Sequence, residues 1–237
     1  MKRIVLYLAL AAFAGAVQAQ AWPTKPIRFV MPYPPGGSSD ILARPIANEM
    51  SKNLGQPVVI ENKPGAGARL AAEYVAGQPA DGYTLMVAPS GAMSIAAATL
   101  PKLSYHPTKT FIPLSMIANF PLILVVPADH PARNVKELVD WAKAHPDKAN
   151  YATTSPAFTI TTELLKLKTG MPGVAISYKS SNEMLLSVIG GQTLLAIPDG
   201  PPTVPMVHGG KVKALAVTGA VRSPQLPDVP SMAEAGF

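Results

Sequence analysis

The stretch IRFVMPYPPGGSSDILARPIANEM, residues 27–50, decides the fold class because it passes from a strand pattern through a glycine turn into a helix pattern. Residues 27–31 are a short apolar run that predicts a buried strand. The apolar residues of 39–53 recur on one helical face, and Ser38 or Ser39 can cap the helix that they predict. The segment is therefore one strand–loop–helix unit.

The same unit is repeated along the chain. A second strand is expected at residues 58–60 with a helix at 68–76, and a third strand at 83–88. After extended stretches at 112–117 and 122–126 a second series of units begins. Its elements alternate in the same way: strands at 150–152, 174–177, 194–197 and 214–218, and helices at 134–145, 159–168 and 182–189.

Alternating strands and helices predict an α/β fold, because a parallel strand can be reached only by a long crossover connection. The chain is long enough for two lobes that each bury a modest core. We expect the first lobe at residues 22–121, the second lobe at 122–218, and a return toward the first lobe over 219–237. In such sheets, ligands bind where the carboxyl ends of the strands meet.

The amino terminus predicts export. Lys2 and Arg3 precede an apolar run over residues 4–17, which is short for a membrane span. Small residues then offer a cleavage position after Ala19 or after Ala21. We therefore expect residues 1–21 to be a signal peptide and the mature protein to be periplasmic, with a retained membrane anchor as the alternative.

Composition excludes several classes of function. The formal net charge of +6 is spread along the chain without a basic run, so a nucleic-acid surface is not expected. The absence of cysteine removes thiolate metal sites and thiol nucleophiles. The four histidines lie far apart, and no motif of a phosphate-binding loop or a serine hydrolase occurs. We expect no catalytic residue, no metal and no cofactor.

Two glycine turns have the chemistry of an anion site. A glycine turn that opens a helix leaves backbone N–H groups unpaired, and the positive end of the helix dipole lies behind them. Gly36-Gly37 before one helix and Gly65-Ala66-Gly67 before the next both fit this description, although either can be an ordinary helix start. Asp40 and Asp199 stay open in the same way, as ligand contacts or as helix-capping and turn residues.

Several motifs, in this order, resemble one protein family. The motifs are PYPPGGSSD at 32–40, LGQPVVIENKPGAG at 54–67, DGYTL at 81–85, SYK at 177–179, GGQ at 190–192, KALAVT at 213–218 and RSPQLPDVP at 222–230. The chain resembles the Bug family of periplasmic substrate-binding proteins of tripartite tricarboxylate transporters, over essentially all of the expected mature chain.

The resemblance implies a type II Venus-flytrap fold whose lobes close on a small carboxylate, such as a di- or tricarboxylate, an aromatic acid or an amino acid. It implies that loops 33–40 and 65–67 hold one carboxylate, and that the loaded protein, as a monomer, docks on membrane permease subunits. Together with the loops at the other strand ends, the expected ligand-binding residues are Tyr33, Pro35, Gly36, Gly37, Ser38, Ser39, Asp40, Gly65, Ala66, Gly67, Ser90, Thr154, Ser155 and Asp199.

Three departures from the family pattern bear on the ligand. The loop at 153–159 reads TTSPAFT, in which Pro156 lacks a donor and Phe158 adds an apolar wall. The turn at 178–180 ends in serine where the family has glycine. Family members continue beyond a position like Phe237, so the first lobe is expected to be incomplete. The alternatives are a truncated non-functional or partner-docking remnant, or a secreted α/β hydrolase.

Overall fold

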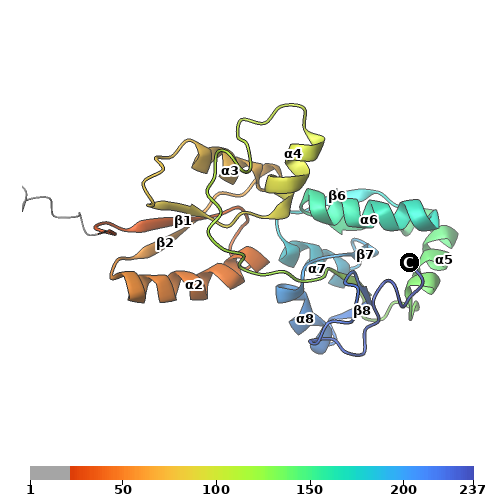
Figure 1. Ribbon diagram of the computed structural model, residues 1–237. Coiled ribbons are helices and arrows are strands. Elements are labelled where there is room, and N and C mark those ends of the chain that lie inside the picture. Colours follow the sequence, from red (N-terminus) through yellow and green to blue (C-terminus); the bar gives the residue numbers. More distant parts are fainter. Residues whose placement is uncertain (1–21) are drawn as a thin grey trace, which may run out of the picture.

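The computed structural model describes residues 22–237, and the expected signal peptide lies outside the described residues. The chain forms two lobes joined by an extended segment, with the carboxyl terminus on the second lobe (Figure 1). Over residues 22–237, every helix is too short or too polar to cross a bilayer.

The first lobe is built on a three-stranded parallel sheet. The strands lie in the order β2-β1-β3, with β1 at Ile27–Met31, β2 at Val58–Asn62 and β3 at Thr84–Met86. Because β1 is central, its side chains are almost fully buried, as the apolar run predicts. Phe29 lies opposite Ile60 on one side and Leu85 on the other.

Helix α2 covers one face of this sheet. Its alanines Ala43 and Ala47 pack against Phe29 and Met31, at the helical spacing that the sequence shows. Gly55 in a left-handed conformation ends the helix. The helices of the first lobe are α2 (Ser38–Leu54), α3 (Arg69–Ala76) and α4 (Ala96–Thr99), with short turns η1 (Ala66–Ala68) and η2 (Gly91–Ile95).

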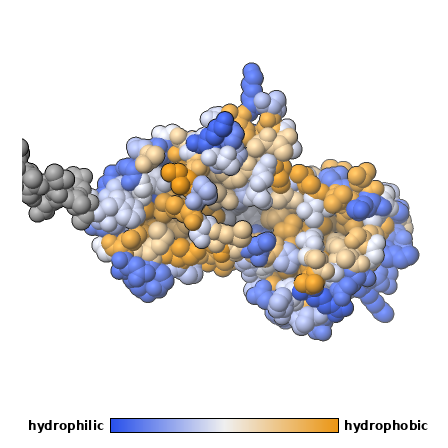
Figure 2. Space-filling model, viewed as in Figure 1, coloured by the Kyte–Doolittle hydropathy of each residue, from blue (hydrophilic) through white to orange (hydrophobic). Residues whose placement is uncertain are grey.

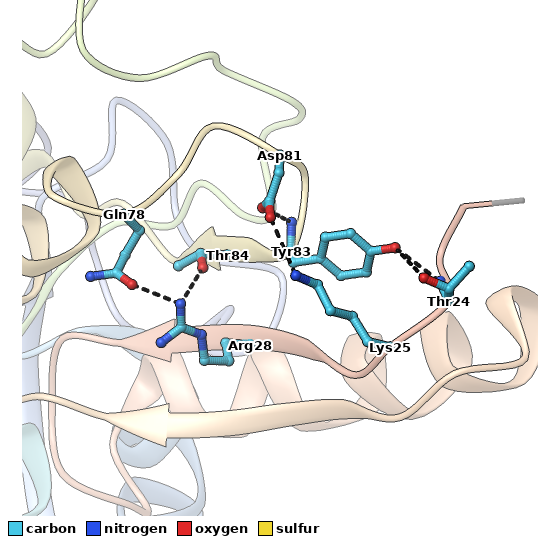
Figure 3. Close-up of polar contacts among 7 residues, drawn as sticks. All are labelled: Thr24, Lys25, Arg28, Gln78, Asp81, Tyr83 and Thr84. Atoms are coloured by element: carbon cyan, nitrogen blue, oxygen red, sulfur yellow. Dashed lines mark hydrogen bonds and ion pairs between the residues drawn. The ribbon is translucent and has the colours of Figure 1, made fainter. Parts of the chain in front are cut away.

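Polar contacts fix the start of the first lobe, at the end of the sheet away from the second lobe (Figure 3). The Arg28 guanidinium donates to Gln78 Oε1 at 2.7 Å and to Thr84 Oγ1 at 3.0 Å. The Lys25 ammonium pairs with Asp81 at 3.4 Å. These contacts join the start of β1 to β3 and to the residues that precede β3.

The second lobe is built on a five-stranded mixed sheet in the order β6-β5-β7-β4-β8. We expected parallel sheets, and β5, β6 and β7 are parallel, whereas β4 runs antiparallel to both β7 and β8. The reason is that β4 enters from the first lobe and runs away from it, whereas the other strands run toward it. The strands are β4 (Ile123–Pro127), β5 (Tyr151–Thr153), β6 (Ala175–Ser177), β7 (Leu195–Ala196) and β8 (Val212–Val217).

Helices cover both faces of the second sheet. Side chains along β4 alternate between two cores, with Leu124 and Val126 on one face and Ile123 and Val125 on the other. This two-sided burial explains why the strand is apolar throughout. The helices are α5 (Val135–Ala144), η3 (Pro146–Lys148), α6 (Pro156–Thr169), α7 (Ser181–Ile189) and α8 (Gly200–His208).

The last residues of the chain pack against the second lobe. Ser231 bridges to Val217, and Met232, Ala235 and Phe237 lie against the core that contains Leu124. The expected return toward the first lobe therefore does not occur within residues 219–237. The predicted capping box is formed, because Ser231 N–H donates to Glu234 and Glu234 N–H donates to Ser231 Oγ, but it closes a turn and not a helix.

The expected extended stretch 112–117 carries no ladder hydrogen bonds in the structure. Ile112, Leu114 and Met116 alternate along it and are each at least three-quarters exposed. Figure 2 shows that apolar residues are interspersed with polar ones on the surface of both lobes. The alternation that predicts a half-buried strand is present here, but the described chain supplies no partner to bury it.

Candidate functional site

A small cavity lies between the two lobes, where the strands of both sheets end. Its volume is about 20 Å³, enough for one or two water-sized probes. Its lining residues come from the β1–α2 connection and from the residues that follow β5, β6 and β7: Tyr33, Gly37, Ser38, Ser39, Thr154, Phe158, Ser180, Ser181 and Asp199.

Four helices begin at this cavity. The residues that precede their first turns are Gly37 for α2, Ser155 for α6, Ser180 for α7 and Asp199 for α8. Only Ser180 uses its side chain to cap its own helix, by accepting from Glu183 N–H. The first turn of α2 therefore keeps backbone donors free of side-chain caps at the junction, with the positive end of the helix dipole behind them. The first turns of α6 and α8 are also without side-chain caps but keep fewer donors, because proline near their starts has no N–H.

Asp40 lies on α2 but faces its own loop. Its Oδ2 accepts from Gly36 N–H at 2.9 Å and from Arg44 Nε at 2.8 Å. Burial opposes the ionisation of Asp40, yet these hydrogen bonds from Arg44 and Gly36 outweigh it and lower the pKa of the carboxyl. Asp40 therefore holds the glycine turn in shape and does not line the cavity.

Asp199 and Ser38 are the unsatisfied polar groups of the cavity. Asp199 is 9% exposed, and its Oδ1 has no partner in hydrogen-bonding geometry. Ser38 Oγ, on the opposite lobe, is also buried without such a partner. Burial raises the pKa of the Asp199 carboxyl, although the hydroxyls of Ser38 and Ser181 oppose the shift. Buried polar atoms without partners are costly, which makes both residues candidates for ligand contact.

Tyr33 reaches from the first lobe toward the second. Burial raises the pKa of its hydroxyl to about 12, the Ser155 hydroxyl opposes this shift, and the negative charge of Asp199 adds to it. The phenol therefore stays protonated at neutral pH and is able to donate a hydrogen bond. Its backbone carbonyl accepts from Asn62 Nδ2 at 2.7 Å, which fixes the loop after β1 to the end of β2.

Two contacts hold the lobes together beside the cavity. Asn182 at the start of α7 donates from Nδ2 to the carbonyl oxygen of Gly36 at 2.9 Å. Gly67 lies so close to Pro156 that an added Cβ would come within 2.8 Å of its Cδ. Both glycine turns of the first lobe therefore face the second lobe.

The structure brings six of the expected site residues to the cavity wall. These are Tyr33, Gly37, Ser38, Ser39, Thr154 and Asp199. The other expected residues lie outside the lining, in the turn before α2, on α2 itself, in the turn before α3, at the start of η2, or at the start of α6: Pro35, Gly36, Asp40, Gly65, Ala66, Gly67, Ser90 and Ser155.

The sequence interpretation omitted Ser180, Ser181 and Asn182 from the site. The signal was present, because β6 is a parallel strand followed directly by a helix, and Ser180 with Glu183 matches a capping box. Applying the strand-end rule to that loop as well would have found them. Phe158, expected as an apolar wall, is among the lining residues.

Comparison with known proteins finds similar sequences over most of the chain. A family model described as "Tripartite tricarboxylate transporter family receptor" matches residues 42–237. Protein BugT of Bordetella pertussis is 33% identical over 237 residues, which are 99% of this chain and 73% of that protein.

Two solved structures from Rhodopseudomonas palustris are similar in fold. Rpa4515 with adipate is 36% identical with a TM-score of 0.86, over 91% of this chain and 73% of that one. MatC with bound malate is 33% identical with a TM-score of 0.85, over 91% of this chain and 74% of that one. Sequence and fold agree over the same lobes, and the chain therefore belongs to the tripartite tricarboxylate transporter receptor family.

Proposed function

We propose that this protein is a periplasmic solute-binding protein that captures a small carboxylate between its two lobes for a tripartite transporter. The observation that carries the proposal is the convergence of four helix amino termini on one interlobe cavity. The family, and two structures with adipate and malate bound, support the same ligand class.

A carboxylate suits the donors at the cavity. It can accept hydrogen bonds from the backbone N–H groups at the starts of α2 and α6 and from the hydroxyls of Tyr33 and Ser38. An anion at the junction would therefore give the buried Ser38 hydroxyl and the available backbone donors charge-assisted hydrogen bonds.

Asp199 favours a ligand with a second polar group. An ionised carboxylate beside the ligand would repel a bare anion, whereas a hydroxyl or ammonium group could donate to Asp199 Oδ1. The raised pKa of Asp199 allows a second arrangement without repulsion, because a protonated Asp199 can itself donate to a carboxylate of the ligand. We therefore propose a hydroxylated or otherwise donor-bearing di- or tricarboxylate over a simple monoacid.

Ligand entry requires the lobes to separate. The cavity of about 20 Å³ is far smaller than any dicarboxylate, and the Asn182 to Gly36 bond closes its side. Hinge opening in this type of fold is absorbed by a few residues between the lobes. Here the connection ahead of β4, over residues 118–122, is the segment that joins them.

The alternative of a secreted hydrolase finds no support in the site. Ser38, Ser155, Ser180 and Ser181 lie at the junction, but a serine nucleophile needs a neighbouring base. No histidine of residues 22–237 lines the cavity, and Asp199 lacks a histidine to orient. We therefore propose binding without catalysis, with membrane permease subunits as the partners of the loaded monomer.

Thermal unfolding and calorimetry with malate and adipate test the proposal. A ligand that binds only the folded protein stabilises it by about 2.7 kcal/mol at a hundredfold excess over its dissociation constant. Ser38→Ala should weaken the ligand more than it destabilises the free protein, because the free protein loses at most the interaction of this hydroxyl with Asp199, whereas the complex also loses a donor to the ligand. Ser115→Ala, at an exposed loop position, is the matched control. Unchanged melting across a panel of di- and tricarboxylates would refute the proposal.

A further inference from the structure

A second and larger cleft lies at the end of the second lobe that points away from the first lobe. Its volume is about 320 Å³, against about 20 Å³ between the lobes. The residues that line it precede the parallel strands β5 and β7 or follow the antiparallel strand β4, so they meet at the edge opposite the interlobe edge. The lining includes Pro127, His130, Trp141, Lys148, Asn150 and Gln192.

His130 lines this cleft and carries a buried donor that no other residue uses. The residue is 7% exposed, and its Nδ1 accepts from Ala132 N–H at 3.2 Å. A neutral imidazole that accepts through Nδ1 carries its proton on Nε2. That Nε2 is buried and has no hydrogen-bond partner among residues 22–237. A buried N–H of this kind costs free energy unless an acceptor reaches it.

The surroundings keep His130 neutral. Burial lowers the pKa of its imidazole, the positive charge of Lys213 lowers it further, and Asp129 opposes both. The Lys213 ammonium donates to the carbonyl oxygens of His130 and Ala132. The backbone of residues 130–132 is therefore held by Lys213, and the imidazole ring of His130 by the Ala132 N–H. The histidine is thus a fixed, uncharged donor at neutral pH.

The rest of the cleft combines a flat aromatic wall with mixed polar groups. Trp141 on α5 stacks on His145 with ring centroids 4.3 Å apart and meets His130 edge to face at 4.8 Å. Asp147 and Lys148 supply one charge of each sign, and Asn150 and Gln192 supply amides. The lining therefore has no net charge and combines apolar with polar residues, as small-molecule sites do.

We propose that this cleft is a second ligand site, which takes a small flat molecule bearing a carboxylate or carboxamide oxygen that accepts from His130 Nε2–H. The oxygen satisfies the buried donor, and the flat body lies along Trp141 and Pro127. The Lys148 ammonium and the Gln192 amide can donate to the second polar atom of the same group. The site is independent of the interlobe cavity.

Tryptophan fluorescence tests the proposal directly, because the chain has only two tryptophans. Trp22 is half exposed on the first lobe, so Trp22→Phe leaves Trp141 as the reporter. In that background, benzoate and benzamide are titrated as probes with the same ring and the same acceptor oxygen. We expect a saturable change in emission at a dissociation constant of about 1 mM or below, which corresponds to about −4 kcal/mol.

Two substitutions of His130 separate the donor from its structural role. His130→Asn places an acceptor where Nδ1 lies, which keeps the Ala132 bond, but removes the donor at Nε2. His130→Gln places an amide donor near Nε2. We expect His130→Asn to weaken the probe about tenfold and His130→Gln to weaken it less. A purely structural histidine would instead make His130→Gln the more damaging change, seen in the melting temperature.

Nitrogen-15 NMR of the imidazole gives a second readout that does not depend on the variants. Binding should shift the Nε2 resonance of His130 and leave its neutral tautomer in place. No saturable change in Trp141 emission or in that resonance, for either probe, would overturn the proposal and show that Nε2–H only faces the indole ring. Binding of malate or adipate between the lobes should be the same in His130→Asn, so the two sites can fail separately.

Discussion

Asn182 of the second lobe donates a hydrogen bond from Nδ2 to the carbonyl oxygen of Gly36 in the first lobe, at 2.9 Å. The two residues are 146 positions apart in the sequence. An added Cβ at Gly36 would come within 3.2 Å of the same amide. The glycine turn before α2 therefore belongs to the candidate site and also forms a hydrogen-bonded contact between the two lobes.

Asn182→Ala should favour the open form. The substitution removes one interlobe hydrogen bond, worth about 1 kcal/mol, and so lowers ligand affinity roughly fivefold. Small-angle scattering should show a larger radius of gyration for the free variant. Asn53→Ala, at the exposed end of α2, is the control and should change neither quantity. Equal compactness and equal affinity in Asn182→Ala would show that the bond does not hold the lobes.

Gly67→Ala should impair the closure of the two lobes more than it lowers the stability of the fold. Gly67 has φ of 62° and lies within van der Waals reach of Pro156, so a methyl group adds strain and pushes the lobes apart. Gly55→Ala is matched, because Gly55 has φ of 67° but nothing within 4 Å of an added Cβ. Both variants should lose about 1 kcal/mol of stability in urea.

Only Gly67→Ala should lose affinity for malate or adipate, by about tenfold or more, as measured by calorimetry. An equal loss of affinity in Gly55→Ala would mean that backbone strain alone weakens the ligand, and that the contact with Pro156 is not part of closure.

Asp199 should make the protein less stable as the pH rises. Its pKa in the folded state is raised by burial, so the folded protein binds the proton more tightly than the unfolded chain. The free energy of unfolding therefore falls as the pH rises from the ordinary aspartate value to the raised one, and is level above it. Asp199→Asn should abolish this slope in urea titrations between mild acid and neutral pH.

The same substitution reports on the ligand. With the negative charge gone, Asp199→Asn should bind a simple dicarboxylate such as adipate more tightly at neutral pH, because repulsion is removed. Malate should gain less, since its hydroxyl exchanges the charged acceptor of Asp199 for a weaker, neutral amide oxygen. If Asp199→Asn left both affinities unchanged, Asp199 would already act as a neutral donor in its protonated form, because the asparagine amide replaces that donor.

The exposed stretch around Leu114 should promote aggregation of the otherwise monomeric protein. Leu114 and Met116 are 75% and 78% exposed, so Leu114→Ser and Met116→Ser should change the free energy of unfolding by less than about 0.5 kcal/mol. Light scattering should show less association in the double variant than in the parent. Leu138→Ala, at a fully buried position, is the contrast and should cost about 2–5 kcal/mol. Unchanged association would mean that another surface is responsible.

Local patterns were sufficient to predict most elements. The run 27–31 becomes β1, the alternation of strands and helices becomes two α/β lobes, and the glycine turn before Ser38 opens α2. These features depend on short-range sterics and on apolar periodicity, which are written in neighbouring residues. The rule that ligands bind at strand carboxyl ends then pointed to Tyr33, Ser38 and Asp199 from the order of elements alone.

Only the tertiary structure decided how those loops meet. It turned Asp40 back onto Gly36, brought Ser180 and Ser181 into the cavity, and left Ser90 and Ala66 outside its lining. It also packed residues 219–237 on the second lobe and placed His130 in the lining of a separate cleft. Side-chain partners across lobes depend on contacts between residues far apart in the chain, and local propensity carries no information about them.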